Sequence, residues 1–215
     1  MRAMSKSIIV TFGWTEYPVI GSIIRHGLES KDKVILLIPA DKDERTEKAI
    51  NDLKAFTRNI PSVELIEERI DISNFLGTVI RIKTILERCK DRIIVNLSGG
   101  MRILVLATYL ASLFTKNVEV EVESENRKFR VYLPSVDVVQ LMKLKNKHLR
   151  VLDMLQQFKG ECLVGELMRM LKFSRSTLYA CIKDLRDMDL VKKTNRKGKI
   201  RITNKGILVN TLLGR

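Results

Sequence analysis

A short run of small and basic residues follows one of the most apolar segments of the sequence, residues 93–97. It comprises Ser98, Gly99, Gly100, Met101 and Arg102, and a long apolar helix pattern begins directly after it. Glycines leave backbone N–H groups uncovered, a helix start carries a partial positive charge, and a hydroxyl and a guanidinium add side-chain donors. The run therefore predicts a cradle for phosphate, with a plain strand-to-helix turn as the alternative.

A second turn follows the first apolar segment, residues 8–12. It contains Gly13, Trp14 and Thr15, and Trp14 is the only tryptophan of the chain. Ligands of an open parallel sheet bind beyond the carboxyl ends of its strands, where the winding reverses, so both turns are candidates for the ligand site. Neither turn has the GxGxxG spacing of dinucleotide-binding folds, and we expect no such cofactor.

The C-terminal part contains a helix with one polar and basic side. Ser174 is a good N-cap, and the helical period turns four apolar side chains inward: Leu178, Cys181, Ile182 and Leu185. The outward residues are small polar, aromatic or basic, as contacts with base edges and phosphates require: Arg175, Ser176, Thr177, Tyr179, Ala180 and Lys183. We interpret this segment as the reading helix of a DNA-binding domain.

A basic hairpin follows the reading helix. Strands are predicted over 190–193 and 199–203, and six of the ten residues from 192 to 201 are basic. Four of these are candidates for contacts with a phosphate backbone: Lys193, Arg196, Lys197 and Lys199. Two preceding helices, marked by apolar spacing over 149–158 and 164–171, complete the order of a winged helix-turn-helix. A protein-binding module and a solvated hairpin edge are the alternatives.

The net charge of +14 is concentrated in the C-terminal part of the chain. Residues 1–134 hold 21 basic and 18 acidic side chains, whereas residues 135–215 hold 18 basic and 7 acidic ones. The alternative is a solvated surface that is rich in Lys and Arg. Such a surface would be enriched in Glu together with Lys, and residues 135–215 are not. The excess predicts a polyanion as the partner of the C-terminal part, and the winged helix-turn-helix order makes double-stranded DNA the expected one.

The N-terminal part alternates short apolar runs with longer amphipathic segments, which is typical of an α/β fold with a mainly parallel, Rossmann-like sheet. Strands are expected near 8–12, 34–38, 63–67, 93–97, 118–123 and 129–133, the last two forming a terminal β-hairpin, and helices near 17–28, 43–57, 73–89 and 100–114. Strict alternation of Val and Glu over 118–123 predicts a strand whose carboxylates all face water.

These patterns predict three segments: a ligand-sensing domain over 1–134, a linker over 135–143 and a winged helix-turn-helix domain over 144–215. The helix near 100–114 is apolar almost all round and needs cover from the sheet and from a neighbouring helix or a second subunit. Three cysteines without a CxxC pair and two histidines predict neither a disulfide framework nor a zinc site. With no apolar segment of about 20 residues and no signal sequence, we expect no membrane contact and a cytoplasmic location.

The sequence VTFGWTE over 10–16 and the sequence NLSGGMR over 96–102 resemble the CARF domain, the CRISPR-associated Rossmann fold. Its fusion to a winged helix-turn-helix resembles the archaeal CRISPR-associated transcriptional regulators. The resemblance implies a homodimer that binds a cyclic oligoadenylate, commonly cyclic tetra-adenylate, across its two-fold axis, with both turns lining the pocket. Relatives often carry Asp at the position of Asn96, so the role of that carboxylate is not carried over.

Two classes of function follow. The first is a ligand-responsive transcription regulator, which is not an enzyme. The second is a ring nuclease that cleaves the cyclic oligoadenylate, with Arg102 or Ser98 stabilising the developing charge. Neither turn contains a histidine, and Glu16 is the nearest carboxylate, which we interpret as a helix-capping group. A regulator that senses another nucleotide is a further alternative.

Overall fold

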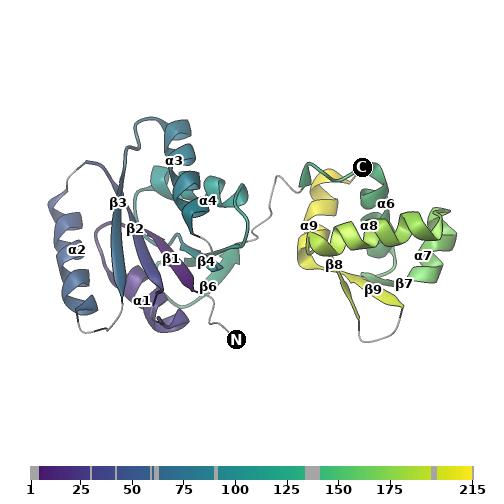
Figure 1. Ribbon diagram of the computed structural model, residues 1–215, viewed down its shortest axis with the longest axis horizontal. Coiled ribbons are helices and arrows are strands. Elements are labelled where there is room, and N and C mark those ends of the chain that lie inside the picture. Colours follow the sequence, from purple (N-terminus) through teal and green to yellow (C-terminus); the bar gives the residue numbers. More distant parts are fainter. Residues whose placement is uncertain are drawn as a thin grey trace. The chain divides into compact units, whose positions relative to one another are not determined.

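The computed structural model describes residues 5–29, 31–41, 43–58, 60, 63–89, 92–133, 141–194 and 198–214 (Figure 1). The chain divides into two compact units, Met1–Asp137 and Val138–Arg215, which we describe separately. Residues 135–140 of the predicted linker lie outside the described residues. Within the described residues, no helix has the length and apolar character needed to cross a membrane.

The first unit is built on a six-stranded sheet with the order β3-β2-β1-β4-β5-β6. Neighbouring strands are parallel except for the antiparallel pair β5 and β6, as the sequence predicts. The strands are β1 (Lys6–Thr11), β2 (Lys33–Pro39), β3 (Glu64–Ile70), β4 (Arg92–Asn96), β5 (Val118–Glu123) and β6 (Arg130–Leu133). The winding reverses between β1 and β4, which places their carboxyl ends side by side.

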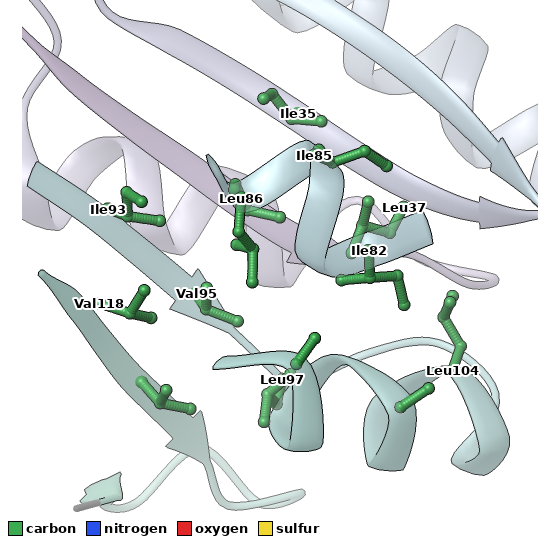
Figure 2. Close-up of a cluster of buried hydrophobic side chains, with 14 of the residues drawn as sticks. Ile35, Leu37, Ile82, Ile85, Leu86, Ile93, Val95, Leu97, Leu104 and Val118 are labelled. Atoms are coloured by element: carbon green, nitrogen blue, oxygen red, sulfur yellow. The ribbon is translucent and has the colours of Figure 1, made fainter. Parts of the chain in front are cut away.

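Helices cover both faces of this sheet: α1 (Tyr17–His26) and α2 (Glu44–Thr57) on one face, and α3 (Phe75–Arg88) and α4 (Arg102–Leu113) on the other. Successive residues of a strand point to opposite faces, so Ile8 packs towards α1 and α2 while Ile9 packs towards α3 and α4. Figure 2 shows the buried cluster on the side of α3 and α4, which includes Ile82, Leu104 and the strand residue Val95. The predicted α/β fold with a Rossmann-like sheet is confirmed.

The second unit follows the winged helix-turn-helix order. Its helices are α6 (Asn146–Gln157), α7 (Val164–Leu171), α8 (Arg175–Asp187) and α9 (Asn204–Leu213). Its strands are β7 (Glu161–Leu163), β8 (Val191–Lys193) and β9 (Lys199–Ile202), which form a sheet of order β7-β9-β8. The sequence predicts all of these elements except β7, which is only three residues long, and α9, whose apolar residues follow no clear helical period.

Candidate ligand and nucleic-acid sites

The two glycine-containing turns of the first unit lie against each other. A Cβ atom on Gly13 would be 3.0 Å from the backbone nitrogen of Gly100, and one on Gly100 would be 3.1 Å from the carbonyl oxygen of Phe12. Gly100 also has a φ of +84°, a conformation that side chains disfavour. Glycine is therefore required here by close backbone approach, and the two turns form one continuous surface.

Strand pairing explains why the turns meet. Val10 of β1 is in register with Asn96 of β4, so both strands end at the same edge of the sheet. The Thr11 hydroxyl then donates a hydrogen bond of 2.6 Å to the carbonyl oxygen of Gly99, which links the end of β1 directly to the second turn.

The second turn is also fixed from the side of β5. The Ser98 N–H donates to Asn96 Oδ1 at 2.8 Å, and the Ser98 hydroxyl accepts a hydrogen bond of 2.9 Å from the Glu123 N–H. The Leu97 N–H donates to the Glu121 carbonyl oxygen at 2.9 Å. The N–H groups of Gly99 and Gly100 have no hydrogen-bond acceptor among the described residues.

The helices that leave the two turns have no side-chain cap. Neither Glu16 before α1 nor Met101 before α4 accepts a capping hydrogen bond with its side chain. By contrast, Asp43, Asn74 and Ser174 cap α2, α3 and α8 in this way. Glu16 is the N-cap residue of α1, as expected, but its backbone carbonyl, and not its carboxylate, accepts from the first turn of the helix.

Arg102 is the first residue of α4, and Asn96 to Gly100 lead into it. It is exposed and makes no ion pair with any described residue. A cation at a helix N-terminus is unfavourable next to the positive end of the helix dipole. With uncapped amides beside it, this arrangement is suited to an anion bound from outside the chain.

Aromatic side chains border the first turn. Trp14 is 68% exposed and lies under the guanidinium of Arg45, 5.1 Å from the ring centroid. Tyr17, just beyond the turn, lies under the guanidinium of Arg127 at 4.3 Å. Sequence reasoning missed both arginines, because α2 and the β5–β6 hairpin reach this edge only in the folded chain.

The prediction that the β5 carboxylates all face water is wrong for Glu121. Its carboxylate is buried, with 1% side-chain exposure. It accepts hydrogen bonds from Ser22 Oγ at 2.9 Å, Arg25 Nη2 at 3.0 Å, His26 Nε2 at 3.0 Å and Asn96 Nδ2 at 3.1 Å. The helix α1 covers this part of the sheet, so the alternation that predicts a wet face marks a buried polar cluster instead.

Burial alone would raise the pKa of Glu121. Hydrogen bonds from Arg25, His26 and Ser22 outweigh it and hold the pKa below its ordinary value, so the carboxylate is ionised. Asn96 donates to the Glu121 carboxylate and accepts from the Ser98 N–H. It therefore connects the buried charge of Glu121 to the second turn.

The reading helix α8 of the second unit has the predicted cap and the predicted inner side. Ser174 Oγ accepts from the Thr177 N–H at 3.2 Å, and Leu178, Cys181, Ile182 and Leu185 are buried. The candidate contact residues Arg175, Ser176, Tyr179 and Lys183 are exposed, and Thr177 is half-buried beside the cap. Arg175 lies over the Tyr179 ring at 5.7 Å, so α8 presents a combined basic and aromatic surface.

The wing carries some of its positive charge in ion pairs. Lys193 on β8 is exposed, but Lys199 on β9 pairs with Glu161 of β7, and Arg201 pairs with the same carboxylate at 2.6 Å. The candidates Arg196 and Lys197 lie outside the described residues. Sequence reasoning missed Glu161 because β7 is too short to predict.

A buried histidine attaches the reading helix to α6. His148 Nδ1 accepts from the Lys145 N–H at 3.0 Å, so its Nε2 carries the proton and donates to Asp184 Oδ2 of α8 at 3.2 Å. Burial lowers the pKa of His148, although the contact with Asp184 opposes this shift. The neutral imidazole therefore fixes the position of α8.

Comparison with known proteins agrees with these two units. The family model described as "Csa3 CRISPR-associated Rossmann-like domain" matches residues 6–134, and the one described as "Bacterial regulatory protein, arsR family" matches residues 146–193. The chain is 25% identical over 209 residues to the "CRISPR locus-related putative DNA-binding protein Csa3" of Saccharolobus solfataricus, with 95% of this chain and 87% of the relative covered.

Two solved structures are similar at lower identity. Can2 from Sulfobacillus thermosulfidooxidans, in complex with cyclic tetra-adenylate, has a TM-score of 0.48 at 16% identity, and protein VC1899 from Vibrio cholerae has a TM-score of 0.47 at 15% identity. Each alignment covers 95% of this chain, but only 63% and 64% of the respective solved chains, so this chain spans less than two thirds of their length. The Csa3 model, in contrast, matches well over half of this chain. The protein belongs to the Csa3 family, with a CRISPR-associated Rossmann-like domain followed by an arsR-type helix-turn-helix.

Proposed function

We propose that this protein is a CRISPR-associated transcription regulator that binds a cyclic oligoadenylate with its first unit and double-stranded DNA with its second. The observation that carries the proposal is the contact of Gly13 with Gly100, which joins two uncapped helix starts into one anion-binding surface. The resemblance to the CARF domain supports the choice of ligand class, and we propose cyclic tetra-adenylate as the ligand.

The proposed ligand site combines donors for phosphate with surfaces for a base. Free amides of the second turn and the N-terminus of α4 suit phosphate oxygens, and Arg102 adds an unpaired guanidinium. The proposed contact residues are those of the two turns: Gly13, Trp14, Thr15, Ser98, Gly99, Gly100, Met101 and Arg102.

The proposed homodimer is supported by an apolar stripe on α4. One side of α4 packs on α3 and the sheet, through residues such as Leu104 (Figure 2). Ile103 and Leu106 on the other side are 44% and 60% exposed. Because this stripe begins directly after the second turn, a symmetric pairing through it would give a ring of repeated nucleotides two equivalent cradles.

The proposed DNA contacts are on α8 and the wing. Arg175, Ser176, Thr177, Tyr179 and Lys183 would face the major groove, and Lys193, Arg196, Lys197 and Lys199 would face the phosphate backbone. Replacing Arg196 and Lys197 by Gln should weaken binding to all duplexes and lower the salt slope by about 2. Arg58→Gln with Lys83→Gln removes the same charge from the first unit and should leave the slope unchanged.

The deciding experiment measures both ligands on the full chain. Isothermal titration with cyclic tetra-adenylate should give heat, and duplex affinity should differ with and without the saturating ligand by a factor of about 5 to 150. Equal duplex affinities would remove the regulatory part of the proposal, and absence of heat would remove the ligand. Chromatography of the recovered ligand should return the intact ring, whereas linear products would establish the ring nuclease.

A further inference from the structure

Arginines from three elements surround the two turns of the first unit. Arg45 is the second residue of α2, Arg102 the first residue of α4, and Arg127 lies in the loop between β5 and β6. Each of these segments begins at the carboxyl edge of the sheet, after β2, β4 and β5 respectively. Three separate parts of the chain thus place an arginine at the same edge of the sheet as the two turns.

Aromatic rings at the first turn hold two of these arginines. Arg45 lies 5.1 Å from the Trp14 ring centroid, and Arg127 lies 4.3 Å from that of Tyr17. Trp14 also lies near the N-cap of α2, since contacts with Thr46 and, to a smaller extent, with Trp14 hold the pKa of the Asp43 carboxyl below its ordinary value. Stacking on a fixed ring orients the planar guanidinium while leaving its N–H groups free to bind an anion.

No carboxylate of the described residues neutralises the charge of Arg45 or Arg127. Among the described residues, neither Arg45 nor Arg127 has a carboxylate within ion-pair distance, although Asp43 and Glu125 are nearby in sequence. By contrast, Arg25 and Arg130, which lie behind the second turn, are paired with Glu121 and Glu123. Carboxylates therefore neutralise the charges of Arg25 and Arg130 behind the turns, whereas Arg45 and Arg127 at the rim of the turns are available to an anion.

We propose that Arg45 and Arg127 are phosphate-binding residues of the ligand site, held in place by Trp14 of the first turn and by Tyr17 at the start of α1 respectively. This inference rests on the proposed function and extends its site to α2 and the β5–β6 loop. It also assigns a role to Trp14 and Tyr17, which each support an arginine while remaining 68% and 53% exposed.

The test uses Trp14 as a built-in reporter, because it is the only tryptophan of the chain. Titration of the full-length protein with cyclic tetra-adenylate should change its fluorescence. Arg45→Gln and Arg127→Gln should each weaken binding about tenfold, as expected for loss of one charge-assisted hydrogen bond, and both should reduce the dependence of affinity on salt. Arg45→Lys should recover only part of the loss, because lysine keeps the charge without the planar fork.

A matched control is available in the same helix. Arg58 is exposed at the C-cap of α2, and the 14 residues of that helix separate it from the turn by about 20 Å. Arg58→Gln therefore removes an identical charge and should leave the affinity unchanged. If the Arg45 and Arg127 variants bind within twofold of the wild type, the inference is wrong while the proposed function stands. If the wild type itself does not bind by calorimetry, the proposed function fails.

Discussion

Replacement of Glu121 by glutamine should strongly destabilise the first unit, although the two side chains have nearly the same shape. In the folded chain, the carboxylate accepts charge-assisted hydrogen bonds from Arg25 and His26 and is almost fully buried. An amide carries no charge, so each contact weakens by about 1 kcal/mol, and the Arg25 guanidinium, which is 20% exposed, keeps only the Glu123 carboxylate at 3.6 Å as a counter-charge. Together these changes predict a loss of about 2 to 4 kcal/mol in the free energy of unfolding.

Urea unfolding at neutral pH, followed by Trp14 fluorescence, measures this loss in the first unit alone, because that unit contains the only tryptophan. The midpoint should fall by about 1 to 2 M. Glu119→Gln is the matched control: it lies two residues earlier on the same strand and face, but its pair with Arg92 is 48% and 51% exposed and should contribute only about 0 to 1 kcal/mol.

The effect of Glu121→Gln should also depend on pH in a defined direction. The folded-state pKa of Glu121 is held below the ordinary value of 4.5, so its contribution to stability is complete above that value and is lost as the pH falls through the folded-state pKa. Glutamine does not titrate, so the difference between wild type and variant should shrink in acid. A variant within about 0.5 kcal/mol of wild type at neutral pH would refute the reasoning, since it would mean that the buried charge is not compensated by its neighbours.

Three further predictions concern single positions. The folded-state pKa of His148 is below its ordinary value of 6.5, so the free energy of unfolding of the second unit should rise with pH up to about 6.5 and level off above it. Hydrogen exchange of α6 and α8 measures this pH dependence, and His148→Gln should abolish it. Leu106→Glu should convert dimers to single chains in sedimentation, whereas Leu212→Glu, on an equally exposed leucine, should not. Gly100→Ala should destabilise the first unit by about 2 to 3 kcal/mol in urea unfolding, through backbone contact and strain, whereas Gly27→Ala, where φ is +62° and space is open, should cost about 1 kcal/mol.

Most of the fold is predictable from local patterns. Buried parallel strands such as β2 are continuous apolar runs, and α8 begins at a serine cap and turns a regular apolar side inward. The two glycine turns are also predictable, because glycine between a buried strand and a helix permits a sharp turn of the backbone. Their direct contact depends on the register of β1 with β4, which no local pattern contains.

The errors occur where one element covers another. The alternation of β5 predicts the periodicity of the strand correctly, but whether its polar face is wet depends on α1, which carries Ser22, Arg25 and His26 above Glu121. For α4, the sequence predicts cover by the sheet and by a neighbouring helix or a second subunit; α3 packs on it, while Ile103 and Leu106 remain exposed. Burial of polar residues is a property of pairs of elements, so single segments do not reveal it.

The rigidity of the two turns limits how a bound ligand can act. Gly13 and Gly100 are already in contact, and Thr11, Asn96 and Glu123 hold the second turn from both sides, so the turns cannot close further around a ligand. We therefore expect the proposed ligand to act through the surface around the turns, which comprises Arg45, Arg102 and Arg127 and the exposed side of α4 at Ile103 and Leu106. Ligand binding should then change the relative placement of the two subunits of the proposed dimer, and not refold the site. Hydrogen exchange with saturating cyclic tetra-adenylate should accordingly slow in the β5–β6 loop and along α4, and remain unchanged in β1 and β4.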